Sequence, residues 1–235
     1  LTWGERKVIG RMQDRIGPNR WGPYGIFQPI ADGIKMLTKE DIVPKKADYW
    51  VHLIAPILII IPAFLIYAVI PFGRELYGAD LNIGVLYVIA LSTIGTMSVF
   101  LAGWSSNNKY ALLGAFRVVA QLITYEIPMV LSSIAVVIMS GSMSMVSIVE
   151  SQDIAYIVSM PLVFLVFLIA SAAELYRAPF DMIEADSELV AGYFTEYSGM
   201  KFVLFFMAEY INLLAMSGII TTLFLGGWRF FGLEQ

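Results

Sequence analysis

A run of twenty residues without a formal charge, 51–70, most limits what this chain can fold into. An apolar run of about 20 residues matches the length of a helix that crosses a bilayer. Because lipid offers no partners to backbone amides, such a run satisfies its hydrogen bonds internally, as a helix does. Similar runs follow at 83–102, 118–139, 154–173 and 202–225. The sequence therefore predicts an all-α fold, a polytopic transmembrane helical bundle with five complete spans.

Composition supports this interpretation and excludes several kinds of chemistry. Hydrophobic residues make up 58% of the 235 residues and charged residues 14%, whereas soluble domains carry about 25% charged residues. The chain has no cysteine and one histidine, His52. It therefore predicts no disulfide, no thiol nucleophile, no cysteine-ligated cluster and no histidine cluster for zinc or haem. His52 lies with Trp50 at the edge of a span, where we expect it to act as an anchor.

The ends of the sequence look like breaks within a longer protein. The chain begins with Leu1 rather than methionine, and charged residues start at Glu5. We interpret residues 1–3 as the tail of a preceding span. We therefore treat residues 1–235 as a single membrane domain and expect the chain to be a fragment.

A short amphipathic helix is predicted between residues 28 and 44, where the sequence is QPIADGIKMLTKEDIVP. Pro29 suits the first turn of a helix, and Pro44 lies beyond its end. Apolar residues recur at helical spacing on one side, at Ile26, Ile30, Ile34 and Leu37. The segment is too short and too polar to span, so we expect it to lie in the membrane interface.

The segment from Ala172 to Lys201 joins the last two spans and is unusually acidic. It holds one arginine, Arg177, and six carboxylates: Glu174, Asp181, Glu184, Asp186, Glu188 and Glu196. Asp181 can cap a helix whose third residue is Glu184, and both would then share a face with Glu188. The simpler interpretation is a solvated acidic loop.

Carboxylates inside the apolar runs argue against that simpler interpretation. Glu126 and Glu209 lie within spans, and Glu174 ends another. A carboxylate inside a bilayer is costly, so each is a candidate for function. A single one is equally well explained as a structural glutamate bonded to a neighbouring helix. Three on the same side of the membrane, beneath an acidic segment, favour a path for protons.

The distribution of basic residues predicts the orientation. The segments 4–48, 103–117 and 174–201 fall on one side and hold thirteen of the fifteen Lys and Arg. Only Arg74 and Arg229 fall on the other side. By the positive-inside rule, the three basic segments face the cytoplasm.

Four long motifs carry a family resemblance. They are ERKVIGRMQDRIGPNR (5–20), GPYGIFQPIADGIKMLTKED (22–41), QLITYEIPM (121–129) and ELYRAPFDMIEADSELVAGYFTEYSGMKFVLFFMAEY (174–210). With them, the chain resembles the H subunit of proton-pumping NADH:quinone oxidoreductase, or respiratory complex I. Its counterparts are called subunit 1 in mitochondria and the A subunit in the photosynthetic complex. The resemblance covers essentially the whole chain. The family has eight spans, which implies that the first and the last two are missing here.

The resemblance implies roles for particular residues. In the family this subunit walls part of a quinone channel and couples quinone reduction to proton translocation. The positions that match the quinone channel are Arg6, Gln13, Arg15, Asp32 and Phe206. The positions that match the family's acidic path are Glu126, Glu174 and Glu209. The positions that match its coupling loop are Arg177, Asp181, Glu184, Asp186, Glu188 and Glu196.

The chain departs from the family pattern at two places in that loop. Leu175 and Tyr176 stand where the family usually has Thr-Asn, and Met182 and Ile183 stand where it usually has Leu-Pro. Both departures leave the charges intact and bear on the conformation of the loop.

The resemblance also implies cofactors and partners. Quinone is the substrate, bound together with partner subunits, while iron–sulfur clusters and FMN are expected in partners and no metal or flavin in this chain. The expected partners are hydrophilic quinone-site and iron–sulfur subunits, small membrane subunits, antiporter-like subunits and the lipid bilayer, and no nucleic acid. The expected location is a bacterial or archaeal plasma membrane, or a thylakoid or inner mitochondrial membrane.

Three alternatives compete with this assignment. Membrane-bound hydrogenases and methanophenazine- or ferredoxin-linked complexes use homologous subunits. A stand-alone ion or proton transporter is expected to show paired halves with interrupted spans, and we find no such pairing in the sequence. A purely structural anchor leaves the glutamates within spans unexplained.

Overall fold

The computed structural model describes residues 1–177, 180 and 192–232 of the chain. The regular structure of that part is helical, without strands, which confirms the predicted all-α bundle. The chain divides into two compact units. The amino-terminal unit comprises Leu1–Val43 and Tyr197–Val203, and the membrane unit comprises Pro44–Glu196 and Leu204–Gln235.

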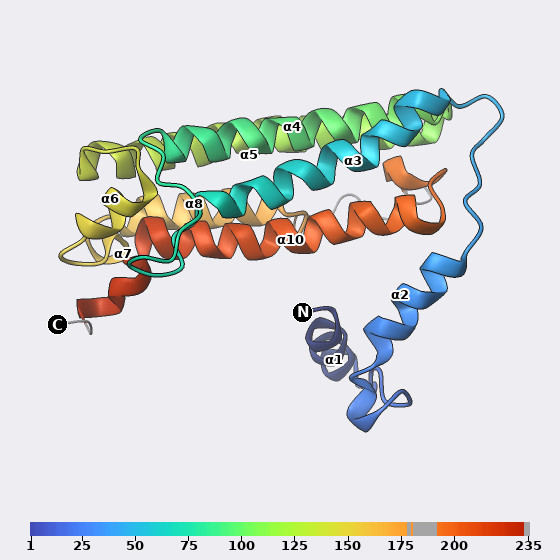
Figure 1. Cartoon of the computed structure of the whole chain (residues 1–235), viewed down its shortest axis with the longest axis horizontal. Helices are drawn as coiled ribbons and strands as arrows, with labels where there is room; N and C mark the ends of the chain where they lie inside the picture. Colours follow the sequence, from blue (N-terminus) through green and yellow to red (C-terminus); the bar gives the residue numbers. More distant parts are fainter. Residues whose placement is uncertain (178–179, 181–191, 233–235) are drawn as a thin grey trace. The chain divides into compact units, whose positions relative to one another are not determined.

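The membrane unit is built from long apolar helices that run alongside one another (Figure 1). Among the described residues, four helices are long and apolar enough to cross a membrane. They are α3 (Tyr49–Leu65, extended by the 3-10 turn η2 at Ile66–Ala68), α4 (Gly84–Ser105), α5 (Lys109–Ser140) and α10 (Gly199–Phe224). A shorter apolar helix, α8 (Pro161–Glu174), lies with them.

The core of the membrane unit draws a few buried side chains from each helix. Ile66, Val88, Met129, Phe167 and Leu223 belong to one hydrophobic cluster that joins η2 after α3 with α4, α5, α8 and α10. The ring centroids of Phe167 and Phe224 are 5.2 Å apart. Tyr67 adds a polar link by donating to the carbonyl oxygen of Ile211 at 2.7 Å. These contacts fix the glutamate-bearing helices α5, α8 and α10 against one another.

Helix α5 begins earlier than the apolar run that predicted it. The span was expected at 118–139 with a loop at 103–117, but α4 continues to Ser105 and α5 starts at Lys109. Asn108 explains the early start, because its side chain accepts a hydrogen bond from the amide of Tyr110 at 3.0 Å. Asparagine is among the best residues for this capping role. The connection is therefore a tight turn.

Helix α8 begins later than its apolar run suggested. The run at 154–173 is divided into α7 (Tyr156–Ser159) and α8, which starts at Pro161. Proline has no amide hydrogen to donate and a fixed φ, so it favours the first position of a helix. Two other short helices, α6 (Met145–Glu150) and η4 (Gly227–Gly232), lie near this end of the unit (Figure 1).

Close packing brings α4 and α5 together next to their connecting turn. A Cβ added at Gly103 would clash with the Cβ of Ala115 and with the carbonyl oxygen of Ala111. Small residues at a helix crossing allow backbones to approach in this way. The two helices therefore form a firm hairpin beneath the turn at residues 106–108.

The amino-terminal unit contains α1 (Thr2–Met12), the 3-10 turn η1 (Pro23–Gly25) and α2 (Gln28–Thr38). The predicted short helix is confirmed, with Pro29 in its first turn. Its apolar residues remain exposed, at 59% for Ile30, 58% for Ile34 and 64% for Leu37. Lys201 pairs with Asp41 at 2.9 Å and ties the start of α10 into this unit.

Candidate functional site

In the amino-terminal unit, a charged pair joins α1 to α2. Nη1 of Arg6 donates to Oδ2 of Asp32, and Nε2 of Gln28 donates to the other carboxylate oxygen at 3.0 Å. Burial raises the pKa of Asp32, but the hydrogen bonds from Arg6 and Gln28, together with the positive charges of Arg6 and Lys35, leave the pKa below its ordinary value. Asp32 is therefore an anion at neutral pH, and Arg6 is held in place by its charge.

The structure also brings together the next two predicted quinone residues. Nε of Arg15 donates to Oε1 of Gln13 at 2.8 Å. Both follow α1 in a tight turn, where the amide of Arg15 donates to the carbonyl of Gly10 at 2.8 Å. The fifth predicted quinone residue, Phe206, lies on α10 in the membrane unit, with its ring centroid 6.0 Å from that of Phe194.

Glu126 on α5 is bound by two hydroxyl groups of α4. Oγ1 of Thr93 lies 2.7 Å from Oε1 of the carboxylate, and Oγ of Ser92 lies 3.3 Å from it. Each hydroxyl also lies within hydrogen-bond distance of the carbonyl oxygen of Ile89. Each hydroxyl has one proton to donate, so Glu126 and that carbonyl compete for it.

Gln121 holds the end of α8, where Glu174 lies. Its Nε2 donates to the carbonyl oxygens of Ala173 at 2.8 Å and Phe180 at 2.9 Å. Oε2 of Glu174 is buried and has no hydrogen-bond partner among the described residues. Glu126 is close enough to Glu174 for their charges to repel each other. A buried carboxylate near another one is suited to holding a proton.

Arg177 pairs with Glu209, which gives this arginine a definite position. Its Nη2 lies 3.2 Å from Oε1 of Glu209, and its guanidinium lies over the ring of Tyr210, 5.3 Å from the centroid. Stacking on an aromatic ring and pairing with a carboxylate suit the planar guanidinium. Arg177 was expected to act with the coupling loop; here it contacts a carboxylate of the proposed proton path.

Tyr176 is a site residue that the sequence did not single out for a role. Its backbone has φ of 54°, which is uncommon outside glycine and costs conformational energy. Burial, followed by the charges of Tyr193, Glu174 and Glu209, raises the pKa of its hydroxyl well above the ordinary value. The hydroxyl therefore stays protonated beside two carboxylates. The only signal in the sequence was its departure from the family pattern.

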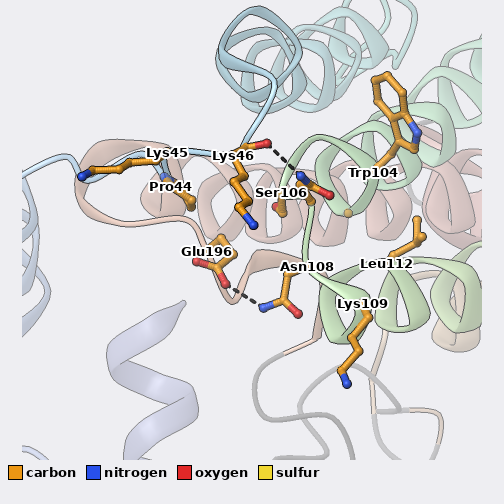
Figure 2. A pocket seen from close by; sticks show the side chains of 11 residues that line it. Pro44, Lys45, Lys46, Trp104, Ser106, Asn108, Lys109, Leu112 and Glu196 are labelled. Atoms are coloured by element: carbon orange, nitrogen blue, oxygen red, sulfur yellow. Dashed lines mark hydrogen bonds between the residues drawn. The ribbon is translucent and has the colours of Figure 1, made fainter.

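Glu196 is attached to the turn between α4 and α5. Nδ2 of Asn108 donates to Oε1 of Glu196 at 2.7 Å, while the carbonyl oxygen of the same side chain caps α5 (Figure 2). Asn108 was not among the predicted site residues, because it falls within the loop expected at 103–117, far in sequence from the acidic segment. The other predicted coupling-loop carboxylates lie outside the described residues: Asp181, Glu184, Asp186 and Glu188.

The carboxylates of the membrane unit do not form a metal site within the described part of the chain. No group of three His, Cys, Asp or Glu side chains there could hold a metal ion. Several polar residues of this unit instead interact with one another through ion pairs and charge. They come from three helices and the segment after α8: Glu126, Glu174, Tyr176, Arg177 and Glu209.

The family profile and the individual relatives that match this chain agree with each other. The sequence profile described as NADH dehydrogenase matches residues 1–233. A protein named as the H subunit of NADH-quinone oxidoreductase, from Dehalococcoides mccartyi strain CBDB1, is 55% identical over 97% of this chain and 65% of its own length. H subunits of the same name from Geobacillus kaustophilus and, numbered H 1, from Geobacter metallireducens are each 52% identical over 97% of this chain.

The chain spans 65% of the length of the two Dehalococcoides relatives and 70% of the Geobacillus one. The match to the family profile nevertheless covers nearly every residue, including both units and the polar residues described above. The chain therefore belongs to the NADH dehydrogenase family.

Proposed function

We propose that this chain is part of a membrane subunit of a complex I-type NADH:quinone oxidoreductase. In this proposal the subunit forms the quinone channel at the junction with a hydrophilic arm and couples quinone reduction to proton translocation. The similarity to proteins named as H subunits supports it, and so do the carboxylates that the membrane unit holds between its apolar helices.

The amino-terminal unit supplies the quinone-binding part of the proposal. Arg6 and Arg15 offer guanidinium donors that suit the oxygen atoms of a quinone head group, and Asp32 and Gln13 hold them in position. Phe206 keeps its expected role as an aromatic contact. Quinone is the substrate, and the iron–sulfur clusters and FMN that deliver electrons belong to hydrophilic partner subunits.

The membrane unit supplies the proton path. The hydroxyl groups bound to Glu126, the buried carboxylate oxygen of Glu174 and the pairing of Glu209 with Arg177 are the observations that support this part of the proposal. A change of charge at reduced quinone would shift protons among these groups, because each carboxylate responds to the charge of its neighbours. Glu196 and the rest of the coupling loop transmit the change.

The remaining parts of the proposal concern location and partners. The ends of α4 and α8, and the start of α3, carry the basic segments and face the cytoplasmic or equivalent negative side. The bilayer is that of a bacterial or archaeal plasma membrane, or of an organelle. Small membrane subunits and antiporter-like subunits adjoin this one and continue the proton path.

Deleting the full gene from its host tests the proposal. Membranes should then lose NADH oxidation coupled to quinone reduction, and a plasmid copy should restore it. Transfer of electrons from NADH to a soluble artificial acceptor serves as the control, because it needs only the hydrophilic arm. If quinone reduction persisted unchanged and only ion transport were lost, the chain would be a transporter and the proposal would be wrong.

A further inference from the structure

A cavity of about 770 Å³ lies in the membrane unit, and no carboxylate of the proposed proton path lines it. Its walls come from the segment before α3, from the end of α4 and the turn into α5, and from Glu196 (Figure 2). We refer to it as the lysine cavity, because Lys45, Lys46 and Lys109 line it. None of the roles proposed above uses these lysines.

The lysine cavity has an excess of positive charge. Glu196 is the one acidic residue among those that line it, and its carboxylate already accepts a hydrogen bond from Asn108. No ion pair joins the three lysines to a carboxylate of the described residues. Helices α3 and α5 begin at this end of the unit and α4 ends there, so two N-termini and one C-terminus add partial positive charge on balance. The cavity is therefore suited to an anion.

Two hydrogen bonds attach the segment before α3 to the end of α4 and the turn into α5, which are walls of the cavity. The amide of Asp48 donates to the carbonyl of Ser105 at 3.0 Å, and Nδ2 of Asn107 donates to the carbonyl of Lys46 at 3.0 Å. Figure 2 shows Lys46 extending toward Glu196 and Asn108, while Lys45 and Lys109 extend outward. A lysine side chain is flexible, so its ammonium group can turn to meet a ligand.

The position of the cavity indicates which kind of anion it binds. It lies where three helices able to span a membrane begin or end, with α3 starting at Tyr49, α4 ending at Ser105 and α5 starting at Lys109. Trp104 lines it and is 51% exposed, and Trp50 nearby is 69% exposed. Exposed tryptophans are typical of the level of lipid head groups. Basic pockets between transmembrane helices bind anionic head groups.

We propose that the lysine cavity binds the phosphate-bearing head group of an anionic membrane phospholipid. The ammonium groups of Lys46 and Lys109 contact the phosphate oxygens, and Trp104 lies against the glycerol and the upper acyl chain. Free phosphate would gain from the lysines but not from Trp104, so a lipid is the better occupant. The proposal does not depend on the electron-transfer activity.

The test uses the intact complex that contains the full-length chain, purified in mild detergent. Native mass spectrometry counts retained anionic phospholipid, and titration with a short-chain anionic phospholipid measures affinity. The double variant Lys46→Gln/Lys109→Gln should lose the retained lipid and weaken the affinity by roughly 30-fold. The control Lys39→Gln/Arg74→Gln removes the same charge from exposed positions outside the cavity and should bind as the parent does.

Two further arms separate the remaining explanations. The variant Lys46→Arg/Lys109→Arg keeps the charge and should retain the lipid, which distinguishes lost binding from lost folding. Inorganic phosphate is titrated in parallel; if it competes as well as the lipid does, the site binds phosphate alone and the proposal fails. Unchanged lipid affinity in the Gln variant would also overturn it. The proposal would also fail if Lys46 or Lys109 cross-linked to a carboxylate of another polypeptide and the complex retained no lipid, because a protein would then occupy the cavity.

Discussion

Nη2 of Arg177 lies 3.2 Å from Oε1 of Glu209, so the segment that follows α8 neutralises a carboxylate on α10. The pair is partly buried, with about a quarter of each side chain exposed (27% and 26%). Removing either partner leaves the other charge poorly solvated. In the proposed function, the pair is therefore a point where a change in the coupling loop would alter the charge state of the proton path.

The first prediction concerns this pair. Arg177→Gln and Glu209→Gln should each reduce quinone-coupled proton pumping, and the double variant should be less impaired than the two losses combined, with a coupling energy of about 1 kcal/mol or more. Arg177→Lys keeps a charge but not the planar group, so it should retain part of the activity. Pumping per electron in reconstituted vesicles measures all four. Independent losses from the two single changes would count against the pairing.

Glu126 and its hydroxyl partners give the second prediction. Glu126→Gln keeps the volume and a hydrogen-bonding head but cannot exchange the proton, so the complex should assemble and lose most of its pumping. Thr93→Val removes the 2.7 Å donor and should lower pumping about tenfold, as expected for a hydrogen bond to a charged group.

Thr96 provides the matched control for that change. Its hydroxyl bonds to the backbone carbonyl of Ser92 at 3.5 Å rather than to the carboxylate. Thr96→Val should therefore pump as the parent does. Equal losses in the two threonine variants would show that the effect comes from packing and not from Glu126.

The third prediction separates the two roles of Asn108. Asn108→Ala removes the cap of α5 and the bond to Glu196, and should destabilise the protein by about 0.5–2 kcal/mol through the cap alone. Asn108→Asp keeps the cap but faces Glu196 with an acceptor, so it should preserve thermal stability and impair coupling. Thermal unfolding and pumping are measured on the same preparations. Parallel loss of both in the Asp variant would contradict separate roles.

Arg6 carries the fourth prediction. Arg6→Gln should raise the KM for quinone and lower quinone reduction, because the guanidinium next to Asp32 is the proposed donor to the substrate. Electron transfer from NADH to a soluble acceptor should remain at the level of the parent. If both activities fell together in an assembled complex, the defect would lie in assembly or electron input.

The lowered pKa of Asp32 leads to the fifth prediction. A carboxylate whose pKa is depressed in the folded protein stabilises it at neutral pH, and this contribution is lost as the pH falls through the folded pKa. Asp32 therefore stays ionised between about pH 6 and 8. Asp32→Asn should lower the rate of quinone reduction by the same factor at every pH in this range. Initial rates across this range check it. A new inflection there in the parent, absent from the variant, would mean that Asp32 titrates near neutrality.

Hydropathy predicted the helical bundle well because lipid requires internal hydrogen bonding, and apolar runs of bilayer length show this directly. It was less accurate about helix ends. The start of α5 depends on the cap from Asn108, and the start of α8 depends on Pro161. Hydropathy is a mean over many residues, so single residues of this kind hardly change it. Pro29 placed α2 correctly because that signal is local.

The site was predicted as a set of residues, but not as a set of contacts. The glutamates stood out because charge is rare in spans, while their partners did not. Thr93 and Tyr176 are ordinary residues in sequence, and only the packing of α4, α5 and the end of α8 brings them to the carboxylates. Gln121 is equally ordinary, and the same packing brings its amide to the backbone carbonyl of Ala173. The pairing of Arg177 with Glu209 joins residues far apart in the chain and had no local signature.

The hydroxyl of Thr93 has two acceptors and one proton, with Glu126 at 2.7 Å and the carbonyl of Ile89 at 3.1 Å. While Glu126 is ionised, the carboxylate is the stronger acceptor. Protonation of Glu126 removes that advantage, and the hydroxyl can rotate to the carbonyl one turn away. The charge of Glu126 therefore determines which of the two acceptors the Thr93 hydroxyl on α4 faces. Infrared absorption of the isotopically labelled Ile89 carbonyl would show whether this hydroxyl changes its acceptor when quinone is reduced.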